Sequence, residues 1–177
     1  AVVDACGDCD GGVTDPNDCW TLQYFTDLPN ETGTSSLVII LDITGLEVGD
    51  EVGLFDSDGI VDGDGNTGEI LVGAAVWTGD QLNVVGVESV DLSQFGGPIL
   101  PGYQGGNSIV YKVWKAEEDA VYDAEAVYSM GDGIWGDILT VVSVLEPIFS
   151  VTQEVEVGPF MLNLVSLNVV PENTEVS

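Results

Sequence analysis

The sequence predicts an all-β fold: a single β-sandwich or jelly-roll-like domain preceded by a short segment rich in cysteine and aspartate. Three observations lead to this prediction. Runs of valine, isoleucine and leucine of strand length recur along the chain, turns containing glycine and proline separate them, and apolar and polar residues alternate within several of them. The alternation is clear at 109–115, where Ile109, Tyr111 and Val113 fall on one face of the expected strand.

Ten segments in chain order have the composition of strands. They are residues 20–26, 36–43, 51–55, 70–77, 82–88, 108–115, 120–128, 138–145, 151–157 and 160–170. Turn sequences such as TGD at 78–80 and GDG at 131–133 separate them. A helical period over ten residues is suggested only at 116–126, where the neighbouring Val-Tyr pairs favour a strand instead.

This pattern divides the chain into three parts. Residues 1–19 form the Cys/Asp-rich arm, residues 20–150 the β-sandwich, and residues 151–177 the C-terminal strands, which belong either to the same sandwich or to a neighbouring subunit. In an oxidising compartment we expect disulfide formation among Cys6, Cys9 and Cys19. A wide loop from Cys19 to Cys6 or Cys9 is favoured, which leaves one thiol for another subunit, and a site in which the three thiolates hold a metal ion is the alternative.

The charge balance restricts the partners. The chain has 31 acidic residues, two lysines and a net charge of -29, so duplex nucleic acid and anionic membranes are poor partners. Such self-repulsion calls for divalent cations or high salt, although a halophilic or simply acidic secreted protein would carry the same charge. The start, AVVDAC, looks like a mature N-terminus after removal of a signal peptide, and no run of 18 apolar residues predicts a membrane span. We therefore expect an extracellular or cell-surface protein, with Asn30 in the sequon NET as a candidate glycosylation site.

Catalytic residue types are scarce. The chain has no histidine, which excludes Ser-His-Asp and Cys-His nucleophile systems. Acid pairs suited to glycoside hydrolysis arise by chance among so many carboxylates, so we assign no catalytic residue and expect no enzyme activity. The four tryptophans at 20, 77, 114 and 135 either pack in the core, which we favour, or form a sugar-stacking platform. In the second case Trp135, in GDGIWGD, is the ring expected to be exposed.

The stretch FDSDGIVDGDGNTGE at 55–69 predicts a calcium loop. Acidic side chains spaced by one residue, with glycines that permit tight turns, let a short loop surround an ion that takes six to eight oxygen ligands. The candidate ligands are Asp56, Asp58, Asp62, Asp64, Asn66 and Glu69. The alternative is a solvated acidic hairpin tip. A second ion is a further candidate in the N-terminal arm, at Asp8, Asp10, Asp15 and Asp18.

Several of these motifs resemble known families. DGDGNTGE resembles the DxDxDG-type loops of EF-hands, dockerins and thrombospondin type 3 repeats, although its acid falls at position eight of the loop and not at twelve. LEVGDEVGLFD, VGAAVWTGD and NSIVYKVWKAEEDAVYDAEAVYSMGDGIWGD resemble a β-sandwich module repeated in large secreted surface proteins of bacteria that export by C-terminal sorting domains. CGDCDGG resembles the CGxCGGD-like linkers beside such modules, and FMLNLVSLNVVPENTEVS resembles the opening of a following module. The resemblance implies an extracellular β module with an adhesive or structural role.

These observations predict a self-assembling structural subunit of an extracellular filament, tube or surface layer, whose partners are copies of itself. We expect calcium as its cofactor, and we expect either the C-terminal strands or the N-terminal arm to complete the sheet of a neighbouring copy by strand exchange. The alternative is a carbohydrate-binding or adhesive module of a larger cell-surface protein, with glycans as partners.

Overall fold

The computed structural model describes residues 20–149. The predicted strands at 151–157 and 160–170 lie outside the described residues, as do the candidate disulfide and second-ion residues of the arm at 1–19.

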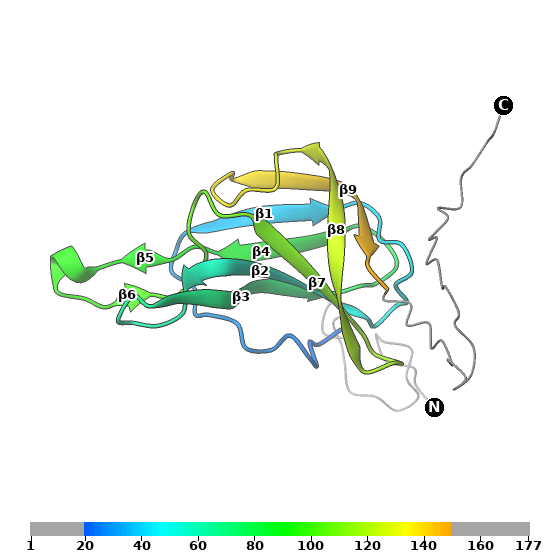
Figure 1. The fold of residues 1–177 in the computed structure, drawn as a ribbon, viewed down its shortest axis with the longest axis horizontal. Coiled ribbons are helices and arrows are strands. Elements are labelled where there is room, and N and C mark those ends of the chain that lie inside the picture. Colours follow the sequence, from blue (N-terminus) through cyan, green and yellow to red (C-terminus); the bar gives the residue numbers. More distant parts are fainter. Residues whose placement is uncertain (1–19, 150–177) are drawn as a thin grey trace, which may run out of the picture.

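The described residues form an all-β domain without an α-helix, which confirms the predicted fold class (Figure 1). The long strands are β1 (Ser35–Ile40), β2 (Glu51–Ile60), β3 (Thr67–Val76), β4 (Leu82–Val87), β7 (Ile109–Lys115), β8 (Ala120–Met130) and β9 (Leu139–Pro147). They make one seven-stranded sheet in the order β3-β2-β7-β8-β9-β1-β4. A small ribbon of β5 (Val90–Asp91) and β6 (Ile99–Leu100), joined through the 3-10 helix η2 (Ser93–Phe95), projects from one end of the long axis.

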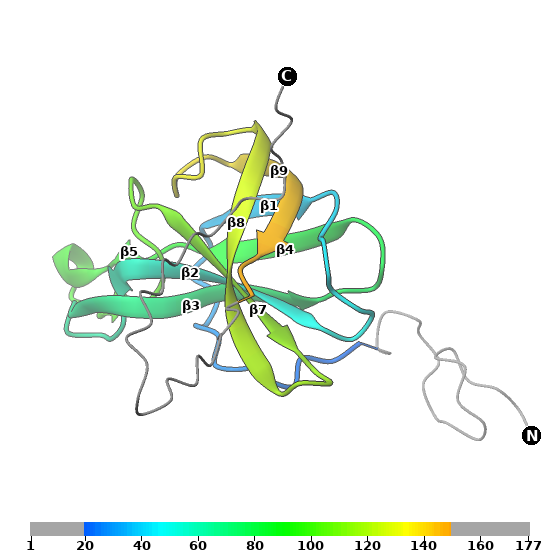
Figure 2. The same ribbon diagram turned by 45° about the vertical axis from the view of Figure 1, so that its right-hand side comes forward.

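The sheet curls on itself nearly into a barrel, so that β3 and β4, its two edge strands, approach each other (Figure 2). Strands β1 and β9 pair in parallel, whereas every other neighbouring pair in this sheet is antiparallel. Gly73 on β3 lies against the backbone of β4, since a Cβ atom there would be 2.4 Å from the Val85 carbonyl oxygen. Only glycine permits this close approach of the two edges.

The core lies between the two sides of the curled sheet. Its fully buried aliphatic residues are Val38, Ile40, Val52, Leu54, Val72, Val113, Val142 and Leu145. Trp135 is only 2% exposed and stacks on Tyr103, with ring centroids 4.3 Å apart and an interplanar angle of 8°. Gly86 makes room for it, because a Cβ there would be 2.6 Å from the indole ring.

The burial of Trp135 corrects one expectation and confirms another. Three of the tryptophans, Trp77, Trp114 and Trp135, are buried, as favoured, and Trp20 is 45% exposed. The expectation that Trp135 would be the exposed ring is wrong. Its segment is hydrogen-bonded to the residues that lead into β7. The backbone N–H of Trp135 donates to the Asn107 carbonyl, and the Trp135 carbonyl accepts from the Gly106 N–H. These bonds turn the ring inward.

Seven of the predicted strands are present, with bounds that differ by a few residues. The predicted strand at 20–26 is wrong, because this segment forms an irregular arm. Its backbone N–H groups bond to the Glu51 side chain or to turns such as Thr26 N–H to the Tyr24 carbonyl, not to a neighbouring strand.

We expect Gly86→Ala to lower the free energy of unfolding by about 1–3 kcal/mol, because the added methyl group overlaps the Trp135 ring in a close-packed core. Urea unfolding followed by tryptophan fluorescence measures the change. Val85→Ala, at the neighbouring position with a side chain 54% exposed, is the matched control and should stay close to the parent chain. Equal stability of the Gly86→Ala variant and the parent would contradict this account of the core.

Candidate functional site

The acidic stretch 55–69 is a hairpin, not a single loop. Strand β2 continues to Ile60 and β3 begins at Thr67, so that only 61–66 forms the turn. Gly59 pairs with Gly68 and Ile60 with Thr67. The prediction that β2 would end at Phe55 is therefore wrong, and the acidic side chains are distributed over two strands and a tip.

Asp56 is fully buried and its oxygens are already occupied. Its carboxylate accepts hydrogen bonds from the backbone N–H of Gln104 at 2.8 Å, the side-chain amide of Asn107 at 3.0 Å and the backbone N–H of Asp58 at 2.9 Å. The side chains of Gln104 and Asn107 also donate to the Asp58 carbonyl, at 2.7 and 3.3 Å. This carboxylate therefore ties the 104–107 loop to β2.

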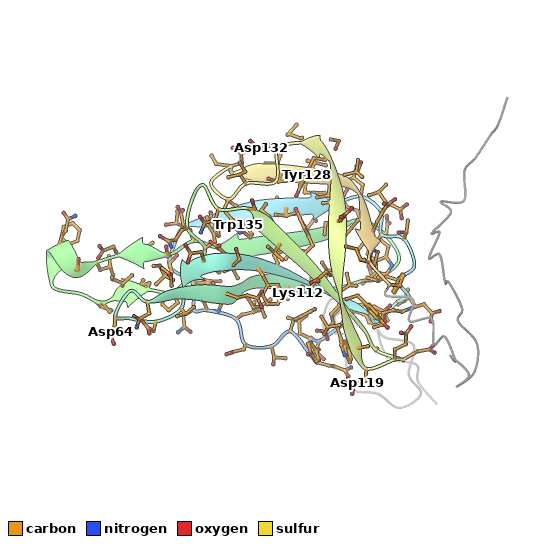
Figure 3. The ribbon with its side chains drawn as sticks, viewed as in Figure 1. Asp64, Lys112, Asp119, Tyr128, Asp132 and Trp135 are labelled. Atoms are coloured by element: carbon orange, nitrogen blue, oxygen red, sulfur yellow. The ribbon has the colours of Figure 1, made fainter. Side chains whose placement is uncertain are left out.

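The remaining predicted ligands fall into two further groups. Asp62 accepts from the backbone N–H groups of Asp64 and Asn66 at 3.0 and 3.1 Å, and from the Asn66 side-chain amide at 2.7 Å. These bonds, the Asn66 side chain first, hold the pKa of Asp62 below its usual value. Glu69 forms an ion pair with Lys112 at 2.7 Å. Figure 3 shows Asp64 at the hairpin tip and Lys112 near the middle of the sheet.

The six residues therefore lie in three groups: Asp56 with Asp58, Asp62 with Asp64 and Asn66, and Glu69 with Lys112. Within residues 20–149 no group of three or more His, Cys, Asp or Glu side chains has the arrangement of a metal site. Calcium binding stays a prediction. The deciding partners, Gln104 and Asn107, were missed by sequence reasoning because they lie 48 and 51 residues from Asp56.

Two more buried carboxylates, those of Asp50 and Glu51, stand at the start of β2. Asp50 is 2% exposed and accepts from the backbone N–H groups of Glu47 and Ala116 at 2.8 and 2.9 Å. Glu51 is 1% exposed and accepts from three consecutive N–H groups of the arm, those of Gln23, Tyr24 and Phe25. Neutral N–H donors thus satisfy both acids, as buried polar groups require.

The arm at 20–34 lies over the outer face of β3, β2 and β7. Phe25 packs there against Leu71, Trp114 and Phe55, over Gly53 of β2. The candidate glycosylation residue Asn30 is exposed in this arm. Two residues later, the Thr32 hydroxyl donates to the Glu88 carbonyl at 2.6 Å and holds the end of the arm.

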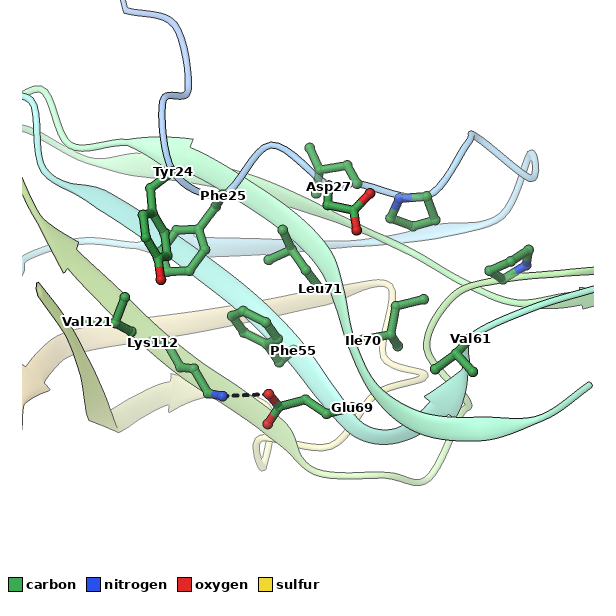
Figure 4. Close-up of a pocket in the computed structure, with 13 residues that line it drawn as sticks. Tyr24, Phe25, Asp27, Phe55, Val61, Glu69, Ile70, Leu71, Lys112 and Val121 are labelled. Carbon is green, nitrogen blue, oxygen red and sulfur yellow. Dashed lines mark hydrogen bonds and ion pairs between the residues drawn. The ribbon is translucent and has the colours of Figure 1, made fainter. Parts of the chain in front are cut away.

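A groove of about 600 Å³ opens between the arm and this face (Figure 4). Its lining includes Tyr24, Asp27, Leu28, Phe55, Val61, Glu69, Ile70, Lys112 and Val121. Lys112 lies 4.7 Å from the centroid of the Phe55 ring and pairs with Glu69. Lys115, the other lysine, pairs with Glu118 at 3.1 Å, so both cations of the chain are already engaged by carboxylates.

Two further grooves follow the edge strands β3 and β4. We call them the arm groove, of about 620 Å³, and the end groove, of about 640 Å³. The arm groove is lined by residues 28–29, 31–35, 72–74, 83, 85 and 87, and the end groove by Trp20, Leu22, Ala74, Ala75, Val76, Thr78 and Asn83. They share Ala74 and Asn83, and within residues 20–149 Glu31 is the one charged residue that lines either groove. In so acidic a chain, this is an unusually uncharged surface.

Comparison with known proteins adds no relative, since no family model, curated protein or solved structure matches the chain. Among the described residues, no helix has the length and apolar character needed to cross a bilayer.

We expect Glu51→Ala to release the arm, because three consecutive N–H groups lose a charged acceptor and such hydrogen bonds are worth about 1.5–3 kcal/mol. Limited chymotrypsin cleavage after Tyr24 or Phe25 should become about tenfold faster or more, as a loss of 1.4 kcal/mol implies. Glu125→Ala, which removes an exposed carboxylate from β8, is the control. An unchanged cleavage rate in the Glu51→Ala chain would show that the arm is held by other contacts.

We also expect Asn66→Ala to raise the pKa of Asp62 toward its usual value, because the Asn66 amide is the main cause of the depression. A depressed folded-state pKa stabilises the fold above the unfolded-state pKa, and this contribution is lost as pH falls through the folded-state pKa. Carbon-detected NMR titration of the carboxyl groups measures the shift. Asp91, whose pKa is lowered by Ser93, is the internal control and should not respond.

Proposed function

We propose that this protein is an extracellular structural subunit that assembles with copies of itself into a filament, tube or surface layer. The observation that carries the proposal is the pair of grooves along the edge strands, whose described lining holds one charged residue, Glu31, in a chain with a net charge of -29. Copies of such a chain repel one another over most of their surface. Close contact is therefore favourable where charge is absent and apolar area can be buried.

The edges of β3 and β4 pair with no further strand within residues 20–149 and, away from their close contact at Gly73, add a second kind of support. An unpaired edge presents backbone N–H and C=O groups to any extended segment that lies beside it. A segment of a neighbouring copy that pairs there gains main-chain hydrogen bonds, with the grooves available for its side chains. The C-terminal strands at 151–177 and the Cys/Asp-rich arm at 1–19 remain the segments that the sequence suggests as strand donors.

Calcium is the cofactor that we propose for the assembly. Both lysines are engaged in ion pairs, so the chain has no other positive side chain to offset repulsion between copies. The exposed carboxylate of Asp64 at the hairpin tip is available to cations shared with a neighbour, and the carboxylate of Asp62, engaged by N–H groups of the tip, adds negative charge beside it. Divalent cations would then act between subunits and not within a preformed loop.

We expect electron microscopy of the full chain in millimolar calcium to show ordered filaments, tubes or layers that disperse when a chelator is added. Calcium should act at concentrations where sodium chloride of equal ionic strength does not, because shared coordination is stronger than screening. Polymers that keep their form and melting temperature in excess chelator would refute the role of calcium, and single compact particles in every sample would refute the assembly itself.

That last outcome would favour the carbohydrate-binding alternative. Trp77 and Trp135 are buried, so sugar stacking would fall on the exposed rings of Trp20 and Tyr24, which are 45% and 49% exposed. A glycan array comparing the parent chain with Trp20→Ala and Tyr24→Ala then distinguishes a binding module from a protein without sugar affinity.

A further inference from the structure

A rigid projection carries the most exposed aromatic ring of residues 20–149. Phe95, the last residue of η2, is 87% exposed at the tip of the β5–β6 ribbon. The chain from Leu92 to Tyr111 contains no charged residue. A large apolar side chain so fully presented to solvent, in a chain otherwise dominated by acids, is the kind of feature that marks an interaction site.

The turn that carries Phe95 is fixed by its own hydrogen bonds. The Leu92 carbonyl accepts from the N–H groups of Phe95 and Gly97 at 2.9 and 3.0 Å, and the Asp91 side chain accepts from the Ser93 N–H at 2.8 Å. Gly96 ends η2 in the left-handed conformation, with φ of 76°. The ring is therefore presented on an ordered turn, and little conformational entropy remains to be lost when it docks.

The projection is also braced against the β2–β3 hairpin. Ile60 and Gly102 exchange two backbone hydrogen bonds, of 2.9 and 3.0 Å. Gly65 lies against Ile99, since a Cβ atom there would be 2.7 Å from the Ile99 side chain. The two hairpins thus support each other, and Phe95 is held out from the body of the domain by both.

The end groove lies at the opposite end of the same strands. Strand β4 runs toward the projection, and β3 runs away from it (Figure 1). The end groove is built where β3 finishes, at Ala74, Ala75 and Val76, and where β4 begins, at Asn83. Among the described residues that line it, none is charged. The described residues therefore present an exposed ring on an uncharged turn at one end and a groove without charged lining residues at the other.

We propose that Phe95 of one copy inserts into the end groove of a second copy, so that subunits join head to tail. This inference rests on the proposed function and specifies one of its interfaces. The chain from Leu92 to Leu100 carries no charged residue, and neither do the described residues that line the end groove, so the ring itself can be buried without desolvating a carboxylate. Because knob and groove are different surfaces, each added copy leaves one of each free, and the contact repeats into an open filament wherever the rotation does not close.

The test uses two variants of the full chain. Phe95→Ser removes the knob, and Asn83→Asp adds a charge to the groove with almost no change in volume; both positions are exposed, so the fold should persist. Each variant alone should raise the concentration needed for filament formation about tenfold or more. Ile138→Ser is the matched control, since Ile138 is 86% exposed and lies outside both surfaces, and it should assemble like the parent.

Mixing the two variants gives the sharper result. The intact knob of Asn83→Asp fits the intact groove of Phe95→Ser, whereas no further copy can add at either end. Analytical ultracentrifugation should therefore show dimers in the mixture and monomers in each variant alone, with circular dichroism confirming that both are folded.

The outcomes separate this inference from the proposed function. Filaments from Phe95→Ser at the parental concentration, or from Asn83→Asp, would overturn the knob-and-groove contact and leave self-assembly standing, as would a mixture that stays monomeric. A parent chain that never assembles would instead overturn the proposed function. Filaments that survive both variants but vanish when residues 159–177 are removed would assign the contact to strand exchange.

Discussion

The structure depends on one constraint: 31 carboxylates share two lysines, so buried acids must be satisfied by N–H donors and not by cations. Strand β2 shows how this is done. The Asp50 carboxylate accepts a hydrogen bond from a backbone N–H of the turn after β7. That of Glu51 accepts from the arm at 20–34, and that of Asp56 from the 104–107 loop. A buried carboxylate without such donors would cost several kcal/mol, so each acid both requires its loop and fixes the position of that loop. β2 is thereby the strand to which the irregular segments of the domain are attached.

The same constraint shapes the surface. Both lysines lie on β7 and are paired with glutamates, so long-range repulsion between copies has no compensating positive patch. Surface regions without charged side chains are then the places where two copies can come into close contact with the least repulsion. The described lining of the end groove and the turn at 92–98 around Phe95 are such regions, and they are separated along the long axis of the domain. Repulsion elsewhere limits the number of ways in which two copies can meet.

Local sequence pattern predicted most of the strands, because β-branched alternation and glycine turns are local signals. The sheet order was not predictable in the same way, since it depends on the parallel β1–β9 pairing between distant segments. The hydrogen-bond partners of the acidic stretch were not predictable for a related reason. Aspartates at alternate positions are equally suited to an ion and to N–H donors, and the donors to Asp56 come from a distant loop. Residues 20–26 have the composition of a strand, but the single side chain of Glu51 takes their N–H groups. The uncharged grooves have no local signature, because they combine β3, β4 and the arm.

Free-energy estimates indicate how much affinity Phe95 and the edge strands would each contribute to assembly. Burying an aromatic ring removes about 150–250 Å² from water, a gross gain of about 4–6 kcal/mol at 25 cal/mol per Å². Association costs about 4–15 kcal/mol in lost translational and rotational freedom, so the ring alone gives a weak contact, and the dimers of the mixed variants form at high protein concentration. The acids beside the projection, Asp62 and Asp91, add repulsion that cations must offset. Phe95 is thus suited to set direction and register, because an ordered turn holds it at one end of the domain. The main-chain bonds available along β3 and β4 are suited to supply the remaining affinity, so the two contacts complement each other.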